Sequence, residues 1–124
     1  MKLIDSYGWI EYFSDGPLTD KYAPHIEGAT ANNTVTPTIV IYEVYKTLKR
    51  ERGQQLALEA YAQMTRTRIL PLDEAGTLSA ADIGLEKGLA MADAIIYSTA
   101  TTHEAELITS DQHLKGLEGV TFIE

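Results

Sequence analysis

Short apolar runs alternate with longer segments of helical periodicity along the whole chain. The short runs predict strands at residues 2–5, 34–36, 68–72, 107–109 and 120–123. The longer segments predict helices at residues 7–13, 18–26, 37–52, 54–65, 74–87 and 91–103, with Ser6 as the N-cap of the first. Because strands alternate with helices, we expect an α/β fold with a mostly parallel central sheet flanked by helices.

Two of the predicted helices carry apolar stripes that should face the core. The stripes consist of Ile41, Val44, Tyr45 and Leu48 in one helix, and of Leu58, Tyr61, Ala62 and Thr65 in the next. The segment at residues 91–103 is apolar nearly all round, which is typical of a buried helix. Trp9, Tyr12 and Phe13 share a helical face and are expected in the core or on an interaction surface.

Composition places the chain among ordinary globular proteins. Its 124 residues, of which 44% are hydrophobic, fit a single domain spanning residues 1–124. With no cysteine, disulfide scaffolds, zinc–thiolate sites and thiol nucleophiles are excluded. No apolar run approaches the ~18 residues of a membrane span, and a strand that starts at Lys2 leaves no room for a signal peptide. We therefore expect a cytoplasmic protein without a membrane partner.

The net charge argues against binding nucleic acid through bulk electrostatics. Ten basic residues face eighteen acidic ones, which gives a formal charge of −8. The excess acid either serves solubility or must be offset by bound cations or a local basic patch wherever a polyanion binds. One stretch is locally basic, at Lys46, Lys49, Arg50 and Arg52. The last two also suit a helix C-terminus, where the helix dipole favours positive charge.

Four carboxylates stand inside or directly after apolar segments, at Asp5, Glu43, Asp93 and Asp111. Burying an isolated carboxylate is costly, so each needs a partner or a metal ion. Asp5 and Asp111 follow strands and Asp93 begins a helix, which brings these three to the same edge of a parallel sheet. With Glu43 reaching in from its own helix, they would form an oxygen-rich pocket. Such a pocket suits Mg²⁺ or Mn²⁺.

Each of these acids also has an ordinary structural role open to it. Asp5 and Asp93 could be N-caps, and Asp111 could be a turn residue. Glu43 could pair with Lys46 on an exposed helix face, and periodicity alone favours that role.

Other catalytic chemistries find little support. His25, His103 and His113 are far apart in the sequence, without metal-ligand spacing, and are interpreted as surface or helix-end residues. No P-loop, nucleophile elbow or dinucleotide-binding glycine motif is present.

The four acids occur in an order that resembles the PIN domain family, and more narrowly its VapC toxins. The motifs are Asp5-Ser6 after the first strand, Pro37 followed by Glu43, Asp93-Ala94-Ile95-Ile96 with Ala100, and Thr109-Ser110-Asp111. The resemblance covers the whole chain and implies a three-layer PIN-like fold.

The resemblance also implies an activity: a metal-dependent endoribonuclease, the toxin of a type II toxin–antitoxin system. It assigns Asp5, Glu43, Asp93 and Asp111 as the catalytic, Mg²⁺- or Mn²⁺-binding acids, with Ser6 and Ser110 as supporting hydroxyls. The expected partners are RNA, held in part by Lys46, Lys49 and Arg50, a cognate antitoxin and a second copy in a homodimer. Gln112 and His113 stand where some members have a further acid, which leaves open whether a second metal binds.

Two other classes of protein are alternatives to a metal-dependent nuclease. The first is a catalytically inactive PIN fold used only for binding proteins. The second is a phosphoryl-accepting receiver domain, which would need adjacent acids after the first strand and a lysine ending a late strand. Asp5 stands alone, and Asp111 follows the late strand, so the receiver interpretation is disfavoured.

Overall fold

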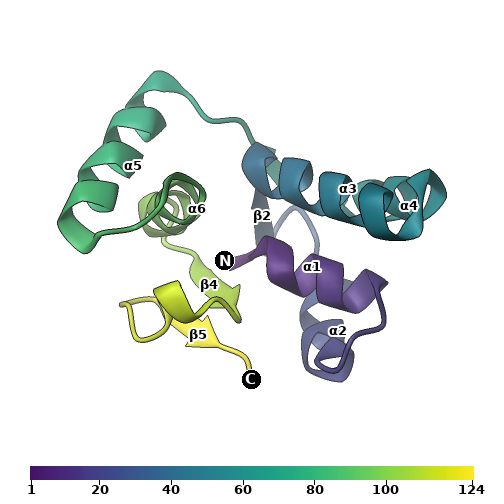
Figure 1. Cartoon of the computed structure of the whole chain (residues 1–124). Helices are drawn as coiled ribbons and strands as arrows, with labels where there is room; N and C mark the ends of the chain where they lie inside the picture. The colour runs from purple at the N-terminus through teal and green to yellow at the C-terminus, as the bar shows by residue number, and fades with distance from the viewer.

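Five short strands form one sheet in which every pair of neighbours is parallel. In the computed structural model, which describes residues 1–124 and is drawn whole in Figure 1, the order across the sheet is β3-β2-β1-β4-β5. The strands are β1 (Lys2–Ile4), β2 (Thr34–Pro37), β3 (Arg68–Leu70), β4 (Glu106–Thr109) and β5 (Val120–Phe122). The predicted α/β fold is therefore confirmed, with a sheet that is wholly rather than mostly parallel.

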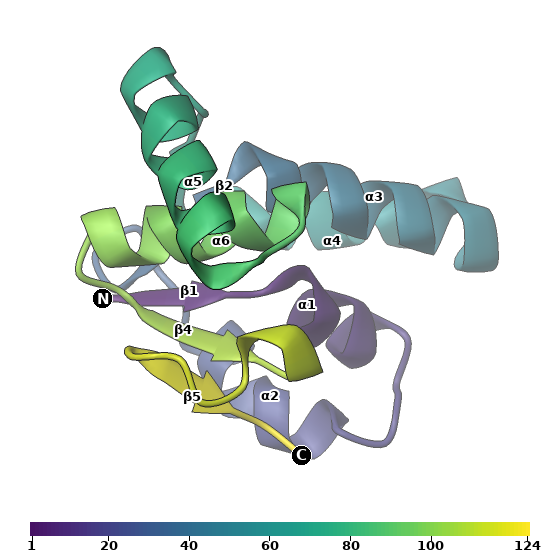
Figure 2. The same ribbon diagram turned by 60° about the vertical axis from the view of Figure 1, so that its left-hand side comes forward.

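Six helices surround this sheet. They are α1 (Ser6–Phe13), α2 (Thr19–Glu27), α3 (Thr38–Arg52), α4 (Gln54–Met64), α5 (Glu74–Lys87) and α6 (Met91–Thr102). A short 3₁₀ helix, η1 (Gln112–Leu114), follows β4. Figure 2 shows α6 over one face of the sheet and α2 over the other, so the sheet lies between helical layers. The helices α3 and α4 run side by side (Figure 1). None of the helices has the length and apolar character required to cross a membrane.

Glycines end two of the helices at positions where the backbone turns into the left-handed half of φ space. Gly53 separates α3 from α4 with φ of 98°, and Gly88 ends α5 with φ of 67°. Residues with a Cβ adopt such angles at a cost, so glycine is favoured at both sites. These two glycines are why the helix ends predicted at residues 52 and 87 agree with the structure.

The buried side chains differ from the prediction on α4. The residues without exposed surface on this helix are Ala57, Ala60 and Met64, whereas Leu58 and Tyr61 are exposed. The predicted stripe was wrong because it followed the largest apolar side chains. Small alanines instead allow α4 to pack closely, and the larger residues face outward along the groove between α3 and α4.

The order of the strands reverses beside β1. The chain runs from β1 outward to β2 and β3, then returns to place β4 and β5 on the other side of β1. In open parallel sheets, a crevice forms at such a reversal, outside the carboxyl ends of the strands. Asp5 comes directly after β1, and Asp111 lies two residues after β4, so both lie at this crevice.

A close approach between α1 and α2 supports the same edge of the sheet. A Cβ on Gly8 would lie 2.4 Å from a ring carbon of Tyr22, so position 8 of this chain requires glycine. Tyr22 is fully buried, and its hydroxyl lies 2.5 Å from the Ser110 hydroxyl in the loop after β4. Because the Ser110 hydroxyl donates its single proton to the Ile123 carbonyl, Tyr22 is the donor to Ser110. These contacts fix the loop that carries Asp111.

Candidate functional site

Asp5 is the most buried acid of the site, with 4% of its surface exposed. It is the N-cap of α1, since its Oδ1 accepts the backbone N–H of Ser6 at 2.7 Å. The prediction that Ser6 is the N-cap was wrong by one position, because the acid itself provides the acceptor. The Ser6 hydroxyl also donates to Asp5 Oδ1, at 3.3 Å. Capping thus holds the Asp5 side chain in one orientation at the end of β1.

Thr109, the last residue of β4, connects Asp5 to the neighbouring strand. Its hydroxyl donates to Asp5 Oδ2 at 2.6 Å and accepts the backbone N–H of Asp111 at 3.0 Å. One fully buried hydroxyl therefore fixes both an acid and the backbone of a second acid. The sequence analysis missed this role, although a polar residue that ends the apolar run Leu107-Ile108 was a usable signal.

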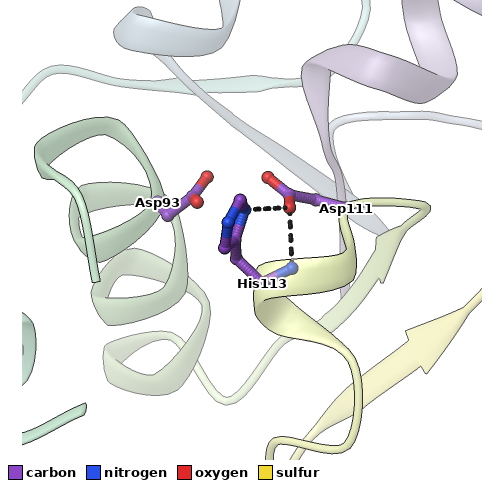
Figure 3. A group of neighbouring side chains, drawn as sticks. All are labelled: Asp93, Asp111 and His113. Atoms are coloured by element: carbon purple, nitrogen blue, oxygen red, sulfur yellow. Dashed lines mark hydrogen bonds and ion pairs between the residues drawn. The ribbon is translucent and has the colours of Figure 1, made fainter. Parts of the chain in front are cut away.

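Asp111 and Asp93 approach each other from different elements. Asp111 is the N-cap of η1, and its Oδ1 accepts the backbone N–H of His113 at 2.9 Å. Asp93 lies in the first turn of α6, whose N-cap is Ala90, so the alternative that Asp93 is an N-cap is wrong. Figure 3 shows the two carboxylates turned toward each other, with the His113 ring beside them.

His113 belongs to this group, although the sequence analysis interpreted it as a surface or helix-end residue. Its ring Nδ1 lies 3.0 Å from Asp111 Oδ1 (Figure 3). One potential ligand atom from each of Asp93, Asp111 and His113 lies within 4.8 Å of the others. The signal was its place two residues after Asp111, where a tight turn brings the ring back to the carboxylate.

Glu43 reaches the site from α3 and has an unsatisfied oxygen. Its Oε1 is buried and has no hydrogen-bond partner in the protein. Ser6 lies close enough to favour the charged form of Glu43, but its single hydroxyl proton is directed to Asp5. A buried acceptor without a partner is rare and costly, so Glu43 Oε1 needs a cation or a proton from outside this network.

The four acids line one cavity of about 460 Å³. Its lining consists of Asp5, Ser6, Tyr7, Ile10, Glu43, Thr47, Asp93, Ser110 and Asp111. All six residues predicted as catalytic or supporting thus lie around the same space, although the Ser110 hydroxyl itself is directed to the Ile123 carbonyl. No lysine or arginine lines this cavity, so no fixed positive charge balances the acids there.

Burial and mutual repulsion act on these acids in the same direction. Burial raises the pKa of Asp5 above 3.8, opposed by the hydrogen bonds from Thr109 and Ser6. Burial likewise raises the pKa of Glu43 above 4.5, and the charges of Asp5 and Asp111 add to the rise. Burial and then the neighbouring Asp111 raise the pKa of Asp93 from 3.8 to about 6. The site therefore resists carrying its full negative charge unless a cation is present.

The donors present fit a hard divalent cation. Carboxylate oxygens are the ligands that Mg²⁺ and Mn²⁺ prefer, and Glu43, one oxygen of which has no partner, lines a cavity that can admit an ion. Asp5, with hydrogen bonds already on both oxygens, has its lone pairs partly engaged. Asp93, Glu43 and Asp111 retain more acceptor capacity.

The basic residues predicted to hold RNA lie outside this cavity. Lys46, Lys49 and Arg50 line a separate apolar groove between α3 and α4. The Lys46 ammonium lies 5.3 Å from the centre of the Tyr42 ring, and the Lys49 ammonium lies 5.6 Å from the centre of the Tyr45 ring. Because α3 also carries Glu43, this groove and the acidic cavity lie on different faces of the same helix.

A family comparison identifies this arrangement. The model of the PIN domain family matches residues 2–120. The chain belongs to the PIN domain family. This result confirms the predicted PIN-like three-layer fold, and nuclease activity is typical of PIN domains. We find no match among curated protein sequences.

Solved structures share the fold along nearly the whole chain. A toxin–antitoxin complex from Klebsiella pneumoniae superposes with a TM-score of 0.81 at 24% identity, covering 98% of this chain and 96% of that chain. VapBC2 from Rickettsia felis, bound to a promoter DNA fragment, gives 0.74 at 17% identity over 98% and 96%. The Mycobacterium tuberculosis toxin VapC20, described as cleaving the sarcin–ricin loop, gives 0.72 at 14% identity over 86% and 85%. At these identities the likeness extends to the PIN fold alone.

Proposed function

We propose that this PIN domain is a metal-dependent endoribonuclease and the toxin of a type II toxin–antitoxin system, with residues 1–124 acting as one domain. The observation that carries the proposal is the convergence of four carboxylates on one cavity that has no lysine or arginine in its lining, with one of the four, Glu43, having a buried oxygen without a partner. Such an arrangement is unfavourable as a purely structural feature, because every member opposes the charge of the others.

Asp5, Glu43, Asp93 and Asp111 would hold Mg²⁺ or Mn²⁺. When bound, the ion would lower the pKa of a water molecule at the site and offset negative charge on the scissile phosphate. Thr109 and the Ser6 backbone orient the Asp5 carboxylate through hydrogen bonds at 2.6 and 2.7 Å, so this acid does not need to reorganise. The Tyr22–Ser110–Ile123 contacts position the loop that carries Asp111.

RNA is the proposed substrate. Its backbone would contact the cations of the α3–α4 groove, Lys46, Lys49 and Arg50, which lie on an otherwise acidic chain. The exposed ring of Tyr42 in the same groove offers a surface on which a base can stack. One structural relative, VapC20, is described as a toxin that cleaves the sarcin–ricin loop, which supports RNA as the class of substrate.

The proposed partner is an antitoxin protein encoded beside the toxin. Relatives from Klebsiella pneumoniae and Rickettsia felis were solved as toxin–antitoxin complexes, the latter bound to DNA. An inhibitor that brings an arginine to the acidic cavity would complement its uncompensated charge, because a guanidinium can pair with two carboxylate oxygens. We further expect a cytoplasmic homodimer.

Cleavage of RNA by the purified chain is the direct test. We expect cleavage with Mg²⁺ or Mn²⁺, none after EDTA, and recovery when either ion is returned in excess. Asp93→Asn should abolish cleavage, while Asp82→Asn, an exposed acid on α5, should not. Undiminished cleavage in EDTA would refute the metal dependence. Ion binding without cleavage of any RNA would instead favour a PIN fold used only for binding proteins.

A further inference from the structure

One side chain at the acidic site has chemistry that the carboxylates do not share. His113 lies in η1, and 81% of its side-chain surface is exposed. Its ring is held beside Asp111 by the contact of 3.0 Å between Nδ1 and Oδ1, and it contributes to the group with Asp93 and Asp111 within 4.8 Å (Figure 3). An exposed ring is free to turn away, so its position over the carboxylates is informative.

Capping alone does not account for this position. Asp111 Oδ1 already accepts the backbone N–H of His113 at 2.9 Å, which completes the cap of η1. The ring adds a second donor to the same oxygen and leaves Asp111 Oδ2 open. In the tautomer with its proton on Nε2, Nδ1 has a lone pair on the same side as the Asp111 carboxylate. The 3.0 Å between Nδ1 and Oδ1 is the separation of two adjacent ligands on an ion with bonds of about 2.1 Å, so a bound ion would take the place of this hydrogen bond.

The spacing of the group suits coordination of one ion. Opposite ligands on an ion with bonds of about 2.1 Å lie roughly 4.2 Å apart. The three potential ligand atoms, all within 4.8 Å of one another, need only small side-chain adjustments to meet that condition. Glu43, whose buried Oε1 has no partner, lines the adjoining cavity, which shows independently that this region lacks a positive counterpart.

We propose that His113 is a nitrogen ligand of the ion held by Asp93 and Asp111, so that the centre is a mixed oxygen and nitrogen site that prefers Mn²⁺ to Mg²⁺. This inference rests on the proposed function, since it presumes that the acids bind a divalent ion. Mg²⁺ strongly favours oxygen and water, whereas imidazole suits the transition ions, whose affinity for nitrogen exceeds that of Mg²⁺. The preference arises from the type of ligand atom.

The test measures ion binding directly on the purified, metal-free chain. Calorimetric titrations with Mn²⁺ and with Mg²⁺ give the two affinities, and pulsed electron paramagnetic resonance of bound Mn²⁺ detects a directly coordinated nitrogen. The wild type should show nitrogen coupling and bind Mn²⁺ more tightly than Mg²⁺. Replacing a residue that only orients a metal ligand lowers metal affinity about 10–100-fold. Losing a direct ligand should cost at least as much, so His113→Ala should weaken Mn²⁺ binding at least tenfold and lose the nitrogen coupling. Its Mg²⁺ affinity should stay within about threefold.

Two further variants sharpen the result. His103→Ala removes a ring that contacts the Thr99 carbonyl at the end of α6, and it should leave both affinities and the nitrogen coupling unchanged. His113→Asp restores an all-oxygen set, so it should abolish the coupling and shift the preference toward Mg²⁺. Since position 113 is exposed, neither substitution there should prevent folding.

The outcomes separate the two proposals. If the wild type binds Mn²⁺ without nitrogen coupling, or if the coupling survives in His113→Ala, the role of His113 is refuted and the metal-dependent function stands. If the wild type binds neither ion, both proposals fail together. Equal losses of Mn²⁺ and Mg²⁺ affinity in His113→Ala would also refute a nitrogen ligand, because loss of a purely positioning contact with Asp111 would affect both ions alike.

Discussion

Asp93→Asn should stabilise the metal-free protein at neutral pH while removing its activity. Asp93 is ionised at pH 7 even though burial and the neighbouring Asp111 raise its pKa from 3.8 to about 6. The folded chain therefore carries this charge at a cost. Asparagine has the same shape without the charge, and its amide can donate to the Asp111 carboxylate as a protonated Asp93 would.

The magnitude follows from the two pKa values. The difference between 3.8 and about 6 corresponds to at most about 3 kcal/mol of free energy of unfolding. Asp93 is only partly buried, so solvent screening reduces this to roughly 1.5 kcal/mol. Removing an acid from the first turn of α6 also removes a favourable interaction with the helix dipole, which costs about 0.5 kcal/mol of stability. A net gain of about 1 kcal/mol is expected at pH 7, or roughly 3–5 °C in melting temperature.

The direction of the pKa shift of Asp93 determines how the stability difference between Asp93→Asn and the wild type changes with pH. Because the folded pKa lies above the unfolded one, the cost is absent below pH 3.8, grows as pH rises, and is complete above about pH 6. The advantage of Asp93→Asn over the wild type should therefore be near zero at pH 4 and full at pH 7. Urea unfolding in EDTA at both pH values measures it, with Asp82→Asn as the matched control on exposed surface. A variant less stable than wild type at pH 7, or a gain independent of pH, would refute repulsion and leave Asp93 as a structural helix acid.

Three further outcomes are expected. Adding Mg²⁺ or Mn²⁺ should raise the melting temperature of the wild type by mass action and that of Asp93→Asn by less, as thermal unfolding would show. Thr109→Val should lower the free energy of unfolding, measured by urea titration, by about 2–4 kcal/mol, because it leaves Asp5 Oδ2 and the backbone N–H of Asp111 without a partner. Thr109→Ser keeps the hydroxyl and should keep most of the stability. Replacing Lys46, Lys49 and Arg50 by glutamine should weaken RNA binding and flatten its salt dependence without altering ion affinity, and an unchanged salt slope would place the RNA elsewhere.

The fold was largely predictable because its signals are local. Proline and glycine mark the ends of α3 and α5, and the alternation of apolar runs with helical periodicity indicates the parallel sheet. The core of α4 was not predictable in the same way. Periodicity ranks residues by size and polarity, whereas the burial of Ala57 and Ala60 depends on how closely neighbouring elements approach.

The candidate site, too, was predictable from the sequence only in part. Asp5 and Asp111 could be placed together because both follow strands that parallel topology brings to one edge. For Glu43, periodicity favoured an exposed pair with Lys46, and only the PIN resemblance assigned it to the site; the structure places it on the cavity. Thr109 and His113 were missed. Their places in the sequence, at the end of an apolar run and two residues after Asp111, were signals, but the hydrogen bond across strands and the tight turn that give them their roles are seen only in the structure.

Asp5 and Asp111 each combine a structural role with a place in the candidate site, which explains why weighing one against the other in the sequence was inconclusive. Each caps a helix and lines the cavity, and capping is what fixes the carboxylate at the crevice. A cap uses one oxygen of the side chain and leaves the second available. For Asp111 that second oxygen is open, whereas for Asp5 it is taken by Thr109. The two caps are therefore not equivalent toward a cation: Asp5 provides buried negative charge in a fixed place, and Asp111, with Asp93 opposite, provides the more accessible oxygen.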